Sequence, residues 1–114
     1  EKLREILANS CKKCDVSSSD GGSYICIEGP QFSSRAESEI YRGFGASVIG
    51  MTNVPESYLA KEAGLAYATL AMVTDYDCWK EEHCAVDEIM KVMKDNNINA
   101  NKVLKVALKE LSID

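Results

Sequence analysis

A nine-residue stretch without a charged side chain, residues 65–73 (LAYATLAMV), constrains the fold more than any other part of the sequence. It is far too short to span a bilayer, and it does not alternate between polar and apolar positions. Such a stretch is typical of a strand that is buried on both faces, as in a sheet covered by helices on both sides. Predicted helices and strands alternate before it, which indicates an α/β fold with parallel neighbouring strands.

Hydrophobic spacing and turn residues predict the other elements. Strands are expected over residues 24–27 and 46–51, and helices over residues 2–14, 55–63, 86–93 and 100–111, the last two separated by the polar residues 95–97. A further helix should begin after Ser33 or Ser34, with Glu37 placed for a capping box, and end at Gly43 and Gly45. Its predicted apolar stripe contains Ala36, Ile40, Tyr41 and Phe44. The predicted order is αβαβαβαα.

Composition limits the classes of function. The chain has 114 residues, 46% of them hydrophobic, and a net charge of −5, which fits one globular domain. Because no dense run of Lys and Arg is present, we expect no nucleic-acid partner and no membrane partner. The charged, amphipathic N-terminus does not resemble a signal peptide, and it lacks an initiator Met. We therefore expect a protein of the cytoplasm, and also of the nucleus, and a chain that begins inside a longer polypeptide.

Five cysteines are spread over predicted helices, strands and loops, which does not indicate a disulfide framework and favours a reducing compartment. Cys11 and Cys14 form a CxxC spacing, but they close a predicted helix, whereas a thioredoxin-like pair opens one. A redox or zinc role for this pair is the less favoured alternative. His83 lies in a charged stretch without a Cys/His cluster, so an exposed histidine and no metal site are predicted.

Two carboxylates follow the apolar stretch directly. Asp75 and Asp77 are two residues apart, so on a strand they would point to the same side. Their mutual repulsion would raise the pKa of one of them towards neutrality, where it could hold or deliver a proton. The alternative is a pair of solvated aspartates at the start of a loop.

Polar side chains also follow the two earlier predicted strands. After the first, Phe32 could stack on a flat ligand and Ser33 could hydrogen-bond to its edge. After the second, Thr52 could offer a hydroxyl and a backbone N–H to an anion at the start of a helix. A helix cap with a core Phe, and an ordinary turn, are the structural alternatives. Because parallel strands end at one edge of a sheet, all three sets are expected to converge there in one ligand site.

Four motifs in order resemble the trimeric purine nucleoside phosphorylase family: EGPQFSSRAE at residues 28–37, GMTNVPE at 50–56, AKEAG at 60–64 and TDYDCW at 74–79. The resemblance implies a nucleoside phosphorylase-like α/β fold, a three-layer αβα arrangement with a mixed, largely parallel central sheet. It also implies that residues 1–114 are the C-terminal part of a single domain. The N-terminal part, with a Gly-rich phosphate loop, would lie outside this sequence.

The branch of the family that these motifs resemble implies phosphorolysis of S-methyl-5′-thioadenosine to adenine and 5-methylthioribose-1-phosphate, in methionine and purine salvage. Inorganic phosphate would be the co-substrate, with no other cofactor. The implied partners are a complementary N-terminal polypeptide and, for the complete protein, two further copies in a homotrimer. The 114 residues alone are expected to be inactive. A broader purine nucleoside phosphorylase and a non-catalytic purine-binding or assembly fragment are the alternatives.

Family roles carry over to matching positions of this sequence. Phe32 would stack on the purine with Ser33 nearby, Met51 would pack on the ribose, and Thr52 would contact phosphate. Asp75 would accept a hydrogen bond from the 6-amino group and help protonate N7, supported by Asp77. In 6-oxopurine relatives an Asn stands at the position of Asp75, and a carboxylate that only accepts hydrogen bonds suits an amino group better. Val86 and Ile89 would line the pocket for the 5′-thioalkyl group.

Overall fold

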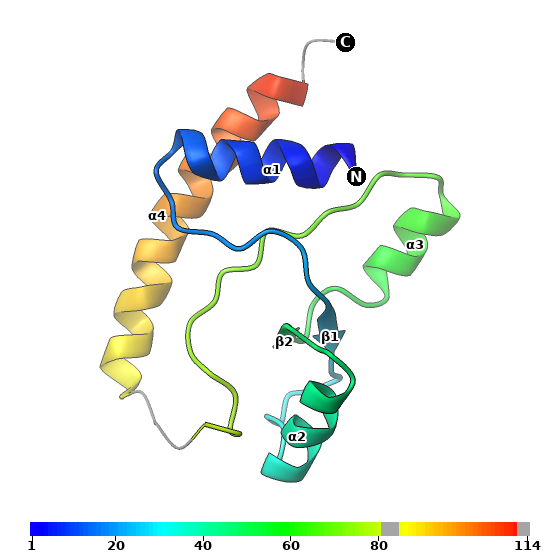
Figure 1. Cartoon of the computed structure of the whole chain (residues 1–114), viewed down its shortest axis with the longest axis vertical. Helices are drawn as coiled ribbons and strands as arrows, with labels where there is room; N and C mark the ends of the chain where they lie inside the picture. Colours follow the sequence, from blue (N-terminus) through cyan, green and yellow to red (C-terminus); the bar gives the residue numbers. More distant parts are fainter. Residues whose placement is uncertain (81–84, 112–114) are drawn as a thin grey trace. The chain divides into compact units, whose positions relative to one another are not determined.

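The computed structural model describes residues 1–80 and 85–111. His83 and Cys84, on which part of the sequence analysis depends, lie outside this range. Figure 1 shows the elements in chain order: helix α1 (Lys2–Lys13), strand β1 (Tyr24–Cys26), helix α2 (Arg35–Gly43), strand β2 (Val48–Gly50), helix α3 (Glu56–Glu62) and helix α4 (Val86–Leu111). They form two compact units. One contains residues 1–21, residues 68–74 and α4, and the other contains residues 22–67 and the segment that begins at Asp75.

The first unit is built by α1 and α4, which come from opposite ends of the chain and pack together. Cys11 of α1 and Val103 and Ala107 of α4 are its buried apolar side chains. An ion pair between Lys13 and Glu110 links the two helices at the surface. As predicted, the CxxC pair closes α1, because Cys14 is the C-cap residue.

The second unit contains a two-stranded parallel sheet, as the sequence predicts for neighbouring strands. Tyr24 lies opposite Val48, and Cys26 lies opposite Gly50. The pairing continues beyond the strands, because the Ile27 N–H donates to the Gly50 carbonyl at 2.9 Å. The two strands therefore end side by side, and the segments that follow them start from the same edge.

The predicted caps of α2 and α3 are confirmed. Ser34 is the N-cap of α2, and its side chain and that of Glu37 form the complete capping box. Gly45 follows the last turn of α2 with a φ of 82°, and Gly64 follows α3 with a φ of 70°. Both are left-handed conformations that glycine adopts at low cost at the ends of helices. These caps fix where the loops that lead to and from the sheet begin.

Two expectations are wrong. Residues 65–73 form no strand, because a strand needs a neighbour to receive its backbone hydrogen bonds, and the described sheet consists of β1 and β2 alone. The two predicted C-terminal helices are one helix, α4. Residues 95–97 contain no Gly or Pro to break it, and the Asn96 side chain is occupied by a 2.9 Å hydrogen bond to the Val73 carbonyl. The apolar stripe of α2 is mostly exposed, with Phe44 at 77%.

The helices within residues 1–80 and 85–111 include none that is long and apolar enough to cross a membrane. The described sheet has only two short strands, so it is smaller than the sheet of the layered arrangement that the family resemblance implies. It is too small to cover the apolar side chains of α2 and α3. The described part of the chain therefore presents many large apolar side chains to solvent, among them Phe32, Phe44, Tyr58, Leu65, Val86 and Leu108.

Candidate functional site

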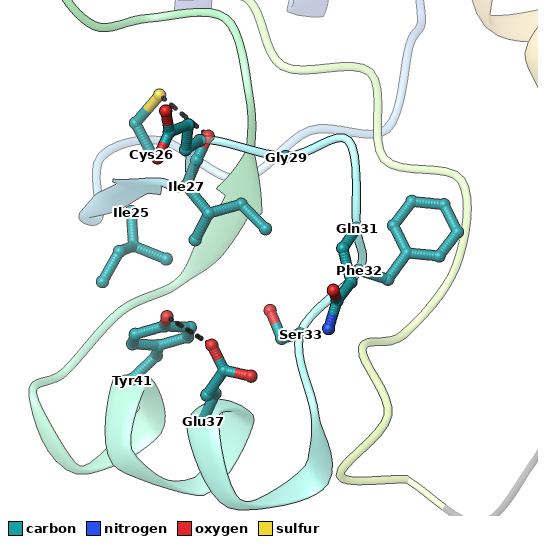
Figure 2. Close-up of a pocket in the computed structure, with 10 residues that line it drawn as sticks. Ile25, Cys26, Ile27, Gly29, Gln31, Phe32, Ser33, Glu37 and Tyr41 are labelled. Carbon is teal, nitrogen blue, oxygen red and sulfur yellow. Dashed lines mark hydrogen bonds between the residues drawn. The ribbon is translucent and has the colours of Figure 1, made fainter.

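A cavity of about 370 Å³ opens at the end of β1, between the segment that follows this strand and helix α2 (Figure 2). Ile25 approaches it from β1 and Ile27 from the residue after the strand, and Glu37 and Tyr41 approach it from α2 (Figure 2). The remaining lining residues belong to the strand end and the loop: Cys26, Glu28, Gly29, Gln31, Phe32 and Ser33. The cavity thus has an apolar side, formed by β1, and a polar side, formed by α2 and the loop.

The segments that follow β1 and β2 meet at Gly29 and Met51. A Cβ atom at Gly29 would lie 2.4 Å from the Met51 sulfur, and the φ of Gly29 is 69°. The left-handed backbone favours glycine at this position, and any Cβ would force the Met51 side chain to move. The thioether of Met51 therefore lies directly on the backbone of the loop that carries Phe32 and Ser33, and the predicted convergence of these two strand ends is confirmed.

The segment at residues 75–80 lies on the same loop and on α2. The Cys78 thiol donates to the Ser33 carbonyl, with 3.1 Å between sulfur and oxygen. The Arg42 guanidinium of α2 stacks 3.9 Å from the centre of the Trp79 ring. Trp79 also meets Tyr76 edge-on, with 5.8 Å between ring centres. These contacts bring the third predicted set of polar residues to the other two, although no strand delivers it.

The two aspartates differ in exposure, with Asp77 half-buried and Asp75 exposed. The argument that they share one face of a strand does not hold, because residues 74–77 are not in a strand. Asp77 nevertheless lies close enough to α2 to act on Tyr41. Burial raises the pKa of Tyr41, and the negative charges of Glu37 and Asp77 raise it further. The Tyr41 phenol is thereby kept protonated, and it donates to the Glu37 carboxylate at 3.5 Å.

Glu37 organises the polar side of the cavity. Its Oε1 atom accepts from the Ser34 N–H at 2.9 Å, and its own N–H donates to the Ser34 hydroxyl at 3.2 Å. The pKa of Glu37 is lowered, first by the Ser34 side chain and then by the Ser34 backbone. A carboxylate therefore sits at the start of α2, where the helix dipole favours negative charge.

The Ser33 hydroxyl also lines the cavity. Its oxygen is buried and has no hydrogen-bond partner within the described residues. A buried hydroxyl without a partner costs free energy, which a ligand that hydrogen-bonds to it would recover. Phe32, by contrast, is 83% exposed, and its ring points away from Ser33 and Tyr41 (Figure 2). The Ser33 hydroxyl can therefore bond to the polar edge of a ligand, whereas the Phe32 ring does not face that hydroxyl in this conformation.

Thr52 follows β2 and is exposed. Its Oγ1 lies 3.4 Å from the Tyr24 hydroxyl and 3.5 Å from the Asn53 side-chain oxygen. Val86 and Ile89 begin α4, which belongs to the other compact unit, with Val86 exposed and Ile89 half-buried. Their assignment to the thioalkyl pocket stays a prediction.

Sequence reasoning missed Tyr24, Tyr41 and Arg42 as parts of this site. Tyr41 was placed only in an apolar stripe, and an arginine in the last turn of a helix carries no local signal for a stack on a distant tryptophan. Metal binding finds no support in the part of the chain that is described, where no group of three or more His, Cys, Asp or Glu side chains could hold an ion.

Comparison with known proteins gives the same family. The model of the phosphorylase superfamily matches residues 1–109. The chain is 51% identical over 114 residues to an S-methyl-5′-thioadenosine phosphorylase of Ciona intestinalis, with 98% of this chain and 41% of the relative covered. It is 48% identical over 113 residues to the Xenopus tropicalis enzyme of the same name, with 97% and 40% covered. The chain therefore spans about two fifths of the length of these relatives.

Solved structures agree. A methylthioadenosine phosphorylase of Schistosoma mansoni in complex with adenine superimposes with a TM-score of 0.86 at 34% identity, over 99% of this chain and 46% of that one. An enzyme from an antarctic soil metagenomic library superimposes with a TM-score of 0.88 at 43% identity, over 97% and 40%. The resemblance predicted from the four motifs is confirmed, and the chain belongs to the phosphorylase superfamily, with the fold of a nucleoside phosphorylase.

Proposed function

We propose that this chain supplies part of the active site of an enzyme that cleaves S-methyl-5′-thioadenosine with phosphate, giving adenine and 5-methylthioribose-1-phosphate. The observation that carries the proposal is the convergence of three separate segments at one site: Met51 lies on Gly29, and the Cys78 thiol donates to the Ser33 carbonyl. Support comes from the relatives of that name and from a Schistosoma mansoni variant enzyme that was solved with methylthioadenosine bound.

The proposed roles follow the chemistry of the groups. Phe32 stacks on the purine, and the unpartnered Ser33 hydroxyl bonds to its edge. Met51 packs on the ribose, and Thr52 donates to phosphate. Asp75 accepts from the 6-amino group and, with Asp77, helps to protonate N7 as the glycosidic bond breaks, which is general acid catalysis worth about 10²–10⁴-fold in rate. Phosphate serves as co-substrate, and no cofactor is needed for this reaction.

The proposal includes a complementary polypeptide that supplies the rest of the domain. In the complete protein, this chain would be the C-terminal part of a three-layer αβα domain with a mixed, largely parallel sheet, assembled as a homotrimer. Large apolar side chains that are exposed here, such as Phe44 at 77% and Leu108 at 63%, support a missing partner, because water seldom covers so many in a finished domain. Without that partner, we expect no phosphorolysis.

A broader substrate range is the second candidate. The Schistosoma mansoni enzyme that superimposes with a TM-score of 0.89 is named an adenosine/methylthioadenosine phosphorylase, and it is 32% identical to this chain. Val86 and Ile89 would then tolerate a 5′-hydroxyl as well as a methylthio group. The two candidates share the 6-amino contact, so they differ in the 5′-substituent alone.

The first experiment measures adenine release from methylthioadenosine, with and without phosphate, by the chain together with the complementary polypeptide.

The second experiment compares Asp75→Asn with Asp95→Asn, which removes the same charge from an exposed position on α4. The Asn amide can donate to a 6-oxo group, whereas a carboxylate cannot. We expect Asp75→Asn to change the ratio of kcat/KM for methylthioadenosine and methylthioinosine by on the order of 10- to 100-fold towards the 6-oxo substrate, the worth of one charged hydrogen bond. An unchanged ratio would remove Asp75 from purine recognition.

A further inference from the structure

The side chain of Tyr24 occupies the space that a side chain at residue 50 would need. The φ angle of Gly50 lies outside the left-handed region, unlike that of Gly29 and Gly45, so its backbone conformation does not require glycine. A Cβ atom there would lie 1.9 Å from the Tyr24 hydroxyl oxygen and 2.8 Å from the ring carbon that carries it. Gly50 pairs with Cys26, two residues after Tyr24, and an aromatic side chain can reach such a diagonal neighbour across a strand pair. The phenol therefore lies over Gly50.

This placement brings the phenol to the segment that follows β2. The Tyr24 hydroxyl lies 3.4 Å from Thr52 Oγ1, on the far side of Gly50 from the start of β1. A threonine hydroxyl has one proton to donate and two lone pairs that accept. The Asn53 side-chain oxygen, 3.5 Å away, competes for that one proton. A donor that occupies a lone pair of Thr52 would turn its proton away from Tyr24, towards the Asn53 oxygen or a better acceptor in solution.

We propose that Tyr24 is a positioning residue: its O–H donates to Thr52 Oγ1, so that the Thr52 proton is directed to an oxygen of inorganic phosphate. The inference rests on the proposed function, in which Thr52 contacts phosphate. Hydrogen bonds of this kind are often long in a site without ligand and shorten when the ligand binds. Gly50 is part of this arrangement, because any side chain at that position would push the phenol away from Thr52.

The test uses Tyr24→Phe, Thr52→Val and the double variant, each in the chain assembled with its complementary polypeptide. Tyr58→Phe is the matched control, since Tyr58 is 67% exposed on α3. Tyr24→Phe should raise the KM for phosphate about fivefold, the effect of one neutral hydrogen bond. The KM for the nucleoside should change less than twofold, and the double variant should be no worse than Thr52→Val. A parallel rise in both KM values, or a Tyr24→Phe effect of full size in the Thr52→Val background, would overturn the inference.

Thermal melting in the presence of inorganic phosphate separates this inference from the proposed function. If phosphate stabilises the assembled protein but methylthioadenosine is not cleaved, the proposed reaction fails, and the same four variants still decide the role of Tyr24 through their phosphate dissociation constants. If phosphate stabilises the protein and Tyr24→Phe leaves its dissociation constant unchanged, Tyr24 does not position Thr52. If phosphate gives the unsubstituted protein no stabilisation, the inference is refuted directly.

Discussion

The stack of Arg42 on Trp79 holds residues 75–80 against α2, and removing the Arg42 guanidinium should loosen that segment measurably. The guanidinium lies 3.9 Å from the ring centre, and the Arg42 side chain is 48% exposed. A cation–π contact at this exposure is worth about 0.5–1 kcal/mol. The ion pair of Arg42 with Glu39, at 3.4 Å on the surface, adds little to this value. Arg42→Gln should therefore reduce the equilibrium constant for docking of residues 75–80 by roughly two- to fivefold.

Trp79 is the single tryptophan of the chain, so its fluorescence reports on this segment alone. In Arg42→Gln, we expect emission at longer wavelength and stronger quenching by acrylamide, because the indole ring becomes more exposed to water. Arg35→Gln is the control, since it removes the same charge from the first residue of the same helix. Arg42→Lys should give an intermediate result, because lysine keeps the charge but loses the planar stack.

Equal quenching in Arg42→Gln and Arg35→Gln would refute this reasoning, because the stack would then contribute nothing to docking. In the assembled enzyme, the same loosening should raise the KM for the nucleoside by up to about fivefold and leave the KM for phosphate unchanged, since the purine contact that we propose for Asp75 needs a docked segment. An effect on phosphate alone would show that the segment serves another part of the site.

Two further predictions concern the loop and the start of α2. Gly29→Ala should destabilise the protein by at least about 1 kcal/mol in urea denaturation and weaken nucleoside binding, because residue 29 has a left-handed backbone and the new Cβ would contact Met51. The control is Gly43→Ala, which should be tolerated because no atom lies within 4 Å of the added carbon. Equal losses of stability in the two variants would contradict this reasoning. Glu37→Gln keeps the capping box but removes the charge. The pKa of Glu37 in the folded protein lies below its ordinary 4.5, so the ionised carboxylate stabilises the fold above that pH. This stabilisation is lost as the pH falls through the lowered pKa. Melting temperatures should therefore fall less steeply below pH 4.5 in Glu37→Gln than in the unsubstituted protein, and parallel curves would exclude this role.

Local signals predicted the local structure well. The capping box of Ser34 and Glu37, the glycine after α2 and the helix end at Cys14 depend on residues within one or two turns, so the sequence contains what determines them. The parallel pairing of β1 and β2 also followed from the alternation of elements. The prediction of a strand at residues 65–73 failed, because strand formation depends on partners that the sequence pattern does not supply.

Contacts between distant residues account for what was missed in the site. The stack of Arg42 on Trp79 joins residues 37 positions apart, and the bond from Cys78 to Ser33 spans 45 positions. Neither pair has a periodic or motif signal. Gly50 was the one available hint of Tyr24, since a glycine inside a strand pattern often marks a close approach, here that of the phenol.

The packing of α1 on α4 has a consequence for how the chain acquires its structure during synthesis. Lys13 and Glu110 are 97 positions apart, and Val103 enters the core only after nearly the whole chain has been made. The sheet of β1 and β2 and helices α2 and α3 are complete by residue 62. During synthesis, the sheet with helices α2 and α3 can therefore fold while α1, which precedes them in the chain, still waits for the helix that covers it.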